Sequence, residues 1–141
     1  MHTLLVTGGV GFIGSTFAKL ALNLGHSVTI LDNLSTGSRE NSYELERLGA
    51  TIVIGDLRDL DLVNSLLKGV NAVIHLGAQI SVPVSVKNPS ETEEINIMGT
   101  QNVIDSCVVA TFCRSFSLVQ FDCRGPLPST HRPWKHPVLP P

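Results

Sequence analysis

The stretch TGGVGFIGS, residues 7–15, decides the fold of this chain. A short apolar run over residues 3–7 leads into it, and apolar residues at three- and four-residue spacing follow it as far as Gly25. This order predicts a buried strand, a tight glycine turn and a helix that ends at Gly25. The expected buried face of that helix consists of Phe12, Ile13, Phe17, Leu20, Ala21 and Leu24.

The three glycines spaced as G-x-x-G-x-x-G are each expected to have a different role. Gly8 permits the tight turn off the strand, and Gly14 lets the helix pack closely on the sheet. Gly11 has no side chain that would keep a pyrophosphate from the N–H groups at the helix N-terminus. A glycine-rich turn that serves packing alone is the alternative, so a dinucleotide site needs a second signal.

Asp32 supplies that second signal. It directly follows a predicted strand over residues 27–31 and stands 18 residues after Gly14. At this position a carboxylate can accept hydrogen bonds from both hydroxyls of an adenosine ribose. The same charge repels a 2′-phosphate, so the sequence predicts NAD as the cofactor in preference to NADP. A solvated acid in a turn is the alternative.

Strands and helices alternate along the rest of the chain, with strands expected over residues 51–54 and 72–76 and helices over residues 40–48, 60–67 and 93–108. On the last helix Ile97, Ile104 and Val108 should share one face. The alternation predicts an α/β fold with a Rossmann-type doubly wound parallel sheet in the order 3-2-1-4, truncated after about four strands. The fourth strand would then lack a neighbour, unless residues 115–121 act as a substitute strand.

Composition is that of one globular domain, with 141 residues, 43% of them hydrophobic, and a formal net charge of −2. The charge argues against a nucleic-acid partner. The N-terminus has no basic leader and its apolar run is short, so we expect no signal peptide, no membrane partner and a cytoplasmic location. Cys107, Cys113 and Cys123 lack the spacing of a disulfide framework or zinc site, so no metal is predicted.

Five ordered motifs identify a family: TGGVGFIGS, LDNLSTG, GDLRD, HLGAQISVPVSVKNP and EINIMGTQNVIDSC. Together they resemble the extended short-chain dehydrogenase/reductase family, and within it the NAD-dependent epimerases and dehydratases of sugar nucleotides. The resemblance is strongest to the UDP-glucose 4-epimerase type and covers residues 1–108. It implies that these residues form a partial NAD-binding domain.

The resemblance also implies which residues bind NAD: Gly8, Gly11, Phe12, Ile13, Gly14, Asp32, Asn33, Ser35, Thr36, Gly37, Asp56, Leu57, Leu76, Gly77, Ala78, Gln79 and Asn96. Asp56 would accept from the adenine amine, and Asn96 would sit on the helix behind the nicotinamide half. The alternatives are that Asp56 caps the following helix and that Asn96 bridges loop backbone. Ser81, Val82 and Ser85 resemble the loop that faces the sugar nucleotide.

The family's catalytic residues have no match in this sequence. In the family a tyrosine takes the proton of the sugar 4-hydroxyl while NAD takes hydride from C4. A lysine four residues after the tyrosine lowers its pKa, and a Ser or Thr steadies the oxygen. Tyr43 is the only tyrosine here, and Arg47 stands four residues later. We therefore assign no catalytic residue and expect this chain alone to be inactive, although the family consists of isomerases and related enzymes.

Residues 109–141 have a different composition, because six of the eight prolines follow Gly125. They are expected to form a disordered or extended tail with no separate domain. Read one base later, degenerate codons for residues 114–123 allow a sequence that resembles the family's fifth strand and its serine turn. This suggests the hypothesis that the tail is a frameshifted reading of an epimerase gene, which sequencing of the locus would test.

Three functional interpretations follow. The first is an NAD-binding portion of a sugar-nucleotide epimerase or dehydratase that does not bind a UDP-sugar productively. The second is a non-catalytic, NAD-responsive module that holds a protein partner through a sheet edge or the tail. The third is an active reductase whose base is His75 or Cys113. The resemblance further implies a homodimer formed through helices near residues 90–108.

Overall fold

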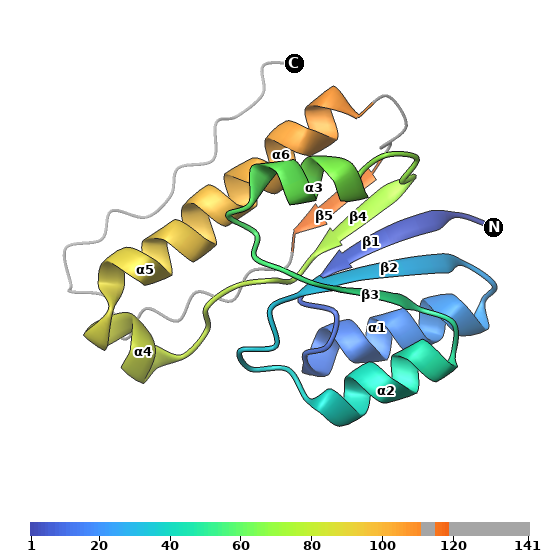
Figure 1. Cartoon of the computed structure of the whole chain (residues 1–141), viewed down its shortest axis with the longest axis horizontal. Helices are drawn as coiled ribbons and strands as arrows, with labels where there is room; N and C mark the ends of the chain where they lie inside the picture. The colour runs from blue at the N-terminus through green and yellow to red at the C-terminus, as the bar shows by residue number, and fades with distance from the viewer. Residues whose placement is uncertain (111–114, 119–141) are drawn as a thin grey trace, which may run out of the picture.

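The computed structural model describes residues 1–110 and 115–118 of the chain. Its centre is a parallel sheet in the order β3-β2-β1-β4-β5 (Figure 1). The strands are β1 (Thr3–Thr7), β2 (Ser27–Asp32), β3 (Thr51–Ile54), β4 (Ala72–His75) and β5 (Ser115–Leu118). Since neighbouring strands are parallel, each connection between them must cross back along the sheet.

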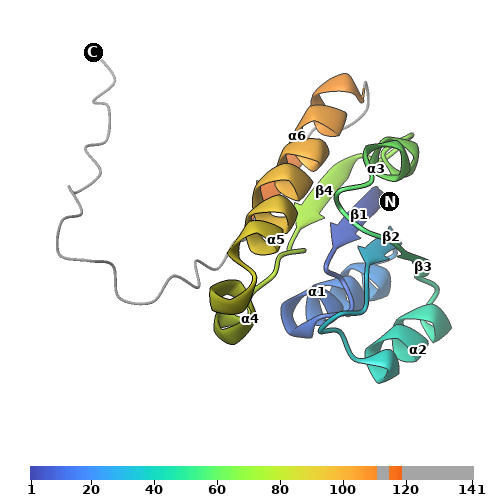
Figure 2. The same cartoon turned by 60° about the vertical axis from the view of Figure 1, so that its left-hand side comes forward.

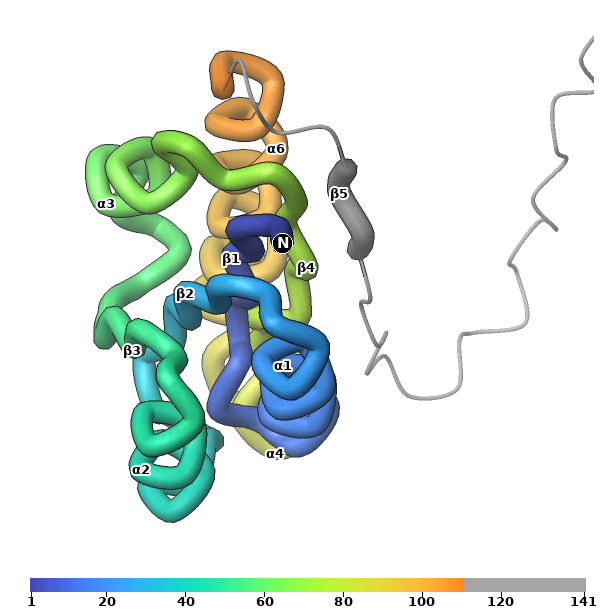
Figure 3. The backbone as a smooth tube through the Cα atoms, turned by 90° about the vertical axis from the view of Figure 1, so that its right-hand side faces the viewer, coloured from blue at the N-terminus to red at the C-terminus, as the bar shows by residue number. Residues whose placement is uncertain are grey.

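Helices make these connections and cover both faces of the sheet. They are α1 (Phe12–Asn23), α2 (Arg39–Arg47), α3 (Leu60–Leu66), α4 (Val82–Lys87), α5 (Pro89–Glu93), the π-helix η1 (Glu94–Met98) and α6 (Gly99–Val109). One layer contains α1 and α2, and the opposite layer contains α3 and α6 (Figures 1 and 3). Within the described ranges, every helix is too short or too polar to cross a lipid bilayer.

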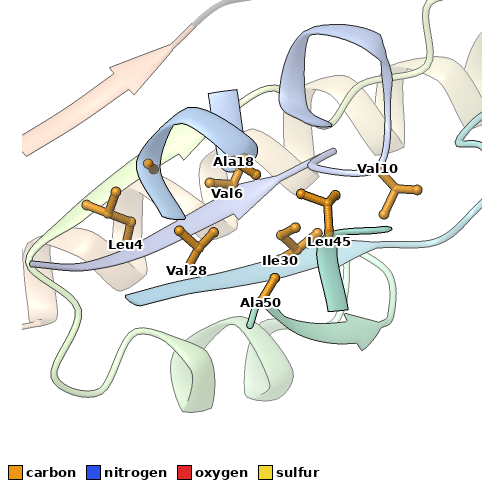
Figure 4. Close-up of a cluster of buried hydrophobic side chains, with 9 residues drawn as sticks. Leu4, Val6, Val10, Ala18, Val28, Ile30, Leu45 and Ala50 are labelled. Atoms are coloured by element: carbon orange, nitrogen blue, oxygen red, sulfur yellow. The ribbon is translucent and has the colours of Figure 1, made fainter. Parts of the chain in front are cut away.

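Alternate residues of the strands face the two helical layers. Leu4 and Val6 of β1 pack in one core cluster with Ala18 of α1 (Figure 4). Leu5, between them in sequence, packs in the other cluster with Val103 of α6. Both faces of β1 are therefore buried, which explains why its middle residues, Leu4, Leu5 and Val6, are all apolar.

The four predicted strands and their order 3-2-1-4 are confirmed, and the structure adds a fifth. β5 pairs in parallel with β4, with Ala72 opposite Ser115 and His75 opposite Leu118. Of the two alternatives for the fourth strand, an open edge and a substitute neighbour, the structure has the second. A substitute strand within residues 115–121 is confirmed over its first four residues. Residues 119–121 lie outside the described part of the chain, as does most of the expected tail.

The predicted buried face of α1 is wrong in most positions. Phe12 is 89% exposed, and Leu20 and Leu24 also face outward. The residues that α1 buries are smaller: Gly14, Ser15, Ala18 and Ala21. The helix lies too close to the sheet and the preceding loop to accommodate large side chains there, which is the role predicted for Gly14. Gly25 ends the helix as expected, with φ +80° and an N–H that donates to the Leu22 carbonyl.

The last predicted helix is found as α5, η1 and α6, which form one continuous helical run (Figure 2). The three apolar residues predicted to share one face of this run, Ile97, Ile104 and Val108, are 64%, 36% and 81% exposed. The inward positions on α6 are Gly99, Val103 and Ser106. Gly99 abuts Leu57, and a Cβ there would lie 2.9 Å from the Leu57 Cβ. Because α6 lies this close to Leu57, the contact position must be a small residue, and larger apolar residues of the helix such as Val108 face elsewhere.

Candidate cofactor-binding site

A cavity of about 300 Å³ opens at the carboxyl ends of β1, β2, β3 and β4. In open α/β sheets ligands bind at this edge, where the strand order reverses. Most of the predicted site residues line the cavity: Gly8, Gly11, Phe12, Ile13, Gly14, Asp32, Asn33, Ser35, Thr36, Asp56, Leu57, Leu76, Gly77, Ala78 and Gln79. Gly37 and Asn96 do not line it. Four further lining residues were not predicted: Leu31, Gly55, Ile80 and Ile95.

The glycine loop crosses the β4 loop at van der Waals distance. Gly8 has φ +66°, and a Cβ on it would lie 2.7 Å from the Gly77 nitrogen. A Cβ on Gly14 would overlap the Gly8 carbonyl oxygen and lie 2.6 Å from the Gly9 Cα. Real Cβ atoms do not approach backbone this closely. Gly8 and Gly14 are therefore required by the fold itself, one by its backbone conformation and the other by packing.

Gly11 has a different environment. It is the N-cap residue of α1, with φ −68°, and within the described residues no side chain caps this helix end. A Cβ on Gly11 would meet only the Gly8 carbonyl oxygen, at 3.3 Å. The protein's own packing therefore does not require glycine here. The first N–H groups of the helix have no carbonyl partner within the helix and lie beside the cavity, which suits this end for binding an anion.

The Asp32 carboxylate is fixed at the end of β2 and is 9% exposed. One oxygen, Oδ2, accepts the Val10 N–H at 3.0 Å, and the other, Oδ1, accepts the Leu34 N–H at 2.9 Å. Each oxygen retains acceptor capacity toward the cavity, because a carboxylate oxygen can accept two hydrogen bonds. This arrangement suits a ligand with two neighbouring hydroxyl groups.

The loop after Asp32 is held by a side chain of its own. The Asn33 Oδ1 accepts the Ser35 N–H at 3.0 Å. Gly37, predicted as a contact residue, lies behind the wall, because a Cβ on it would be 3.1 Å from the Val10 side chain. Gly37 allows the loop to pack on Val10 and does not line the cavity, and its contact with a bound cofactor stays a prediction.

Asp56 is paired with Arg58 at the β3 end of the cavity. The guanidinium Nη2 donates to Asp56 Oδ2 at 2.6 Å, and Nε donates to Oδ1 at 3.0 Å. These hydrogen bonds lower the pKa of Asp56 and raise that of Arg58. Asp59, not Asp56, caps α3, with Oδ1 accepting the Leu62 N–H at 3.0 Å, so the capping alternative for Asp56 is wrong. A ligand amine at Asp56 would share the carboxylate with Arg58.

Asn96 holds the β4 loop from outside the cavity. Its Oδ1 accepts the Gln79 N–H at 2.7 Å, and its Nδ2 donates to the Gln79 carbonyl oxygen at 3.1 Å. The backbone of Gln79 is thus fixed at two points by one amide. Of the two interpretations of Asn96, the bridge to loop backbone is the one found. Its influence on a ligand would be exerted through Gln79.

The other candidate residues lie away from the cavity wall. Ser81, Val82 and Ser85 belong to the start of α4, and the Ser85 hydroxyl donates to the Val82 carbonyl at 2.9 Å. Tyr43 is 65% exposed on α2. His75 is 2% exposed and is also absent from the wall, so it cannot act as a base on a ligand bound there. Cys113 lies outside the described residues.

The unpredicted lining residues differ in how easily a sequence would have revealed them. Leu31 and Gly55 directly precede Asp32 and Asp56, so adding the residue before each predicted acid would have included them. Ile80 follows the predicted run that ends at Gln79. Ile95 reaches the cavity from η1. A π-turn has no clear sequence signal, so this contact required the structure.

The fold and the site together define a dinucleotide-binding domain of the Rossmann type. The sequence pattern of the NAD dependent epimerase/dehydratase family matches residues 4–122. The chain therefore belongs to this family, as the five motifs predicted.

Relatives and solved structures agree with this assignment. A UDP-glucose 4-epimerase from Erwinia amylovora is 36% identical over 134 residues, covering 89% of this chain and 40% of that protein. The UDP-glucose 4-epimerase from Thermotoga maritima, crystallised with UDP-glucose, has a TM-score of 0.74 at 33% identity and covers 81% of this chain and 36% of that one. The UDP-glucose 4-epimerase from Thermus thermophilus, crystallised with NAD, has a TM-score of 0.66 at 40% identity. The match covers 74% of this chain and 33% of that one. The chain thus spans little more than a third of their length.

Proposed function

We propose that this chain is the NAD-binding portion of a sugar-nucleotide epimerase of the UDP-glucose 4-epimerase type. The observation that carries the proposal is that the uncapped N-terminus of α1 and the Asp32 carboxylate both open on one cavity. A dinucleotide requires both features, N–H donors for its pyrophosphate and a pair of acceptors for its adenosine ribose. The relatives crystallised with NAD support this choice of ligand.

Each part of NAD has suitable residues in the cavity. Asp32 would accept from the ribose hydroxyls, and the first turn of α1 would bind the pyrophosphate. Asp56 and Leu57 would contact the adenine on the β3 side. The loop over residues 76–79 would then hold the nicotinamide half, because β4 lies on the other side of β1 from β2 and β3. Bound NAD would supply a hydride acceptor.

We further propose that this chain binds NAD without turnover. The described residues offer no phenol at the cavity, because the one tyrosine of the sequence, Tyr43, lies exposed on α2. His75 is buried behind the wall. A proton acceptor for a sugar hydroxyl would have to come from elsewhere, and the relatives are about three times as long as this chain. UDP-sugar binding and epimerisation are therefore proposed for a longer protein and not for these residues alone.

Protein partners are the second part of the proposal. Ile97 of η1 and Val108 of α6 are 64% and 81% exposed. Exposed apolar side chains along this one helical run favour association. Pairing of two copies through η1 and α6 is the arrangement that the family resemblance implies. The same exposed residues support the second candidate, an NAD-responsive module that holds another protein. Sedimentation of the purified chain, followed by a pull-down with and without NAD, would separate a homodimer from that module.

A pair of valine substitutions on α1 tests the assignment of the site. In Gly11→Val the added methyl groups would lie where phosphate oxygens must approach the helix N-terminus, so NAD affinity should fall more than about tenfold, or roughly 1.4 kcal/mol. The control is Thr16→Val, which places the same side chain on the exposed face of the same helix. Calorimetry should show parental affinity for the control. Equal NAD affinities for the parent and Gly11→Val would refute the site.

A further inference from the structure

A chain of three polar side chains crosses the centre of the molecule. Thr7, at the end of β1, is fully buried, and His75, at the end of β4, is 2% exposed. The Thr7 Oγ1 lies 2.6 Å from His75 Nδ1, and His75 Nε2 lies 2.9 Å from the Oγ1 of Thr100 on α6. One imidazole therefore joins two strands and a helix.

The direction of these hydrogen bonds follows from the capacity of the Thr7 hydroxyl. Its oxygen accepts the Gly77 N–H at 3.1 Å. It also shares the Leu76 N–H, at 3.2 Å, with the Thr7 carbonyl oxygen, which lies 3.1 Å from the same nitrogen. A hydroxyl oxygen has two lone pairs, and both are used. Its contact with His75 Nδ1 must therefore be a donation from the O–H. Nδ1 is then the unprotonated nitrogen, and Nε2 carries the proton and donates to Thr100.

The environment of His75 keeps the imidazole neutral, as this arrangement requires. Burial disfavours the charged form and lowers the pKa of His75 to about 4. At neutral pH the ring has one proton, which the Thr7 contact assigns to Nε2. The contacts on both ring nitrogens fix the orientation of the imidazole and favour the Nε2–H tautomer.

These hydrogen bonds hold backbone groups of the cavity wall in place. Thr7 holds the N–H of Gly77 at the point where Gly8 crosses it, and both glycines line the cavity. Thr100 is four residues after Asn96 in the same helical run, and Asn96 fixes the backbone of Gln79. The β4 loop is thus tied to β1 at its beginning and to η1 at its end.

We propose that His75 is a positioning residue, fixed as the Nε2–H tautomer, that sets the β4 loop for the nicotinamide half of NAD. This rests on the proposed function, because it concerns the half of the cofactor that the β4 loop would contact. His75 would not touch the cofactor itself. Its effect would pass through Thr7 to the backbone of Leu76 and Gly77.

The tautomer can be measured directly in the parent chain. Nitrogen-15 NMR of imidazole-labelled protein at neutral pH distinguishes a protonated from an unprotonated ring nitrogen. We expect His75 to be protonated at Nε2 alone. Protonation at Nδ1, or a mixture of the two tautomers, would overturn the proposal. This measurement needs neither NAD nor a substitution, so it stands apart from the proposed function.

Ligand binding tests the positioning role. Thr7→Val removes the hydroxyl with little change of shape, and Thr7→Ser keeps it as a matched control. We expect Thr7→Val to bind NAD about tenfold more weakly than the parent while its AMP affinity stays within about twofold, because AMP lacks the nicotinamide half. Thr7→Ser should bind both ligands as the parent does.

Other outcomes would count against the role. Unchanged NAD affinity in Thr7→Val, or equal losses for NAD and AMP, would show that the hydroxyl does not act on the nicotinamide half. If the parent chain binds neither ligand, the proposed function fails and the positioning role fails with it. The NMR result would still report the tautomer in that case.

Discussion

Lowering the pH from 7 to 4 should destabilise the folded chain through His75. Burial lowers the pKa of this imidazole from 6.5 to about 4. Between these values the unfolded chain binds a proton at His75 and the folded chain does not, so stability falls as the pH drops. The stability linked to the neutral form of His75 is fully present above pH 6.5 and is lost by about pH 4. At about 1.4 kcal/mol per pH unit, the loss amounts to about 3 kcal/mol.

Urea unfolding between pH 7 and pH 4 at constant ionic strength measures this loss. His75→Phe keeps a buried ring without the titrating group, so its stability should change less over the same range. The pKa of Asp56 is lowered by its hydrogen bonds to Arg58, so its contribution is lost only at lower pH. A parent chain that loses stability no faster than His75→Phe would refute the reasoning. An NMR titration of His75 in the parent chain with a midpoint near 6.5 would do so without any substitution.

Three further predictions concern the glycine loop, cofactor choice and turnover. Gly14→Ala should lower the free energy of unfolding by about 1–3 kcal/mol, because its Cβ would overlap the Gly8 carbonyl oxygen. The control is Gly25→Ala, at a left-handed position with open space around it, which should lower the free energy of unfolding by only about 1 kcal/mol. Equal losses for the two variants in urea unfolding would contradict close packing at Gly14. Asp32→Asn removes the charge that repels a 2′-phosphate, so the ratio of NAD affinity to NADP affinity should fall about tenfold in calorimetric titrations. An unchanged ratio would place Asp32 away from the ribose. The purified chain should not interconvert UDP-glucose and UDP-galactose, and turnover by this chain alone would overturn the view that it lacks a catalytic base.

Much of the sheet could be predicted from the sequence because parallel strands covered by helices are mainly apolar. The runs that became β1, β3 and β4 have this character, and glycines or acids end them. The helix faces could not be predicted in the same way. Periodicity selects the largest apolar residues, whereas α1 and α6 bury small residues such as Ala18 and Gly99 where they approach the sheet or Leu57. β5 was only an alternative, because its sequence departs from the family's pattern.

The site shows a similar division. The residues of the glycine loop and Asp32 follow from local motifs, because their chemistry depends on neighbours within the same turn. The ties behind the wall do not follow, since Thr7 and His75 are 68 residues apart and Gln79 and Asn96 are 17 apart. The sequence left open whether the Asn96 amide contacts the cofactor or bridges loop backbone, and it did not indicate that the partner would be Gln79. Likewise, the pairing of Asp56 with Arg58 changes what its carboxylate can accept.

A calorimetric titration of the parent chain with NAD tests the central claim most directly. The claim is that the first turn of α1 and Asp32 together bind a dinucleotide. We predict saturable binding of one NAD per chain, weaker binding of NADP, and a higher thermal unfolding midpoint at saturating NAD by mass action. A chain that unfolds cooperatively yet shows neither heat of NAD binding nor a shift of its midpoint would contradict this account.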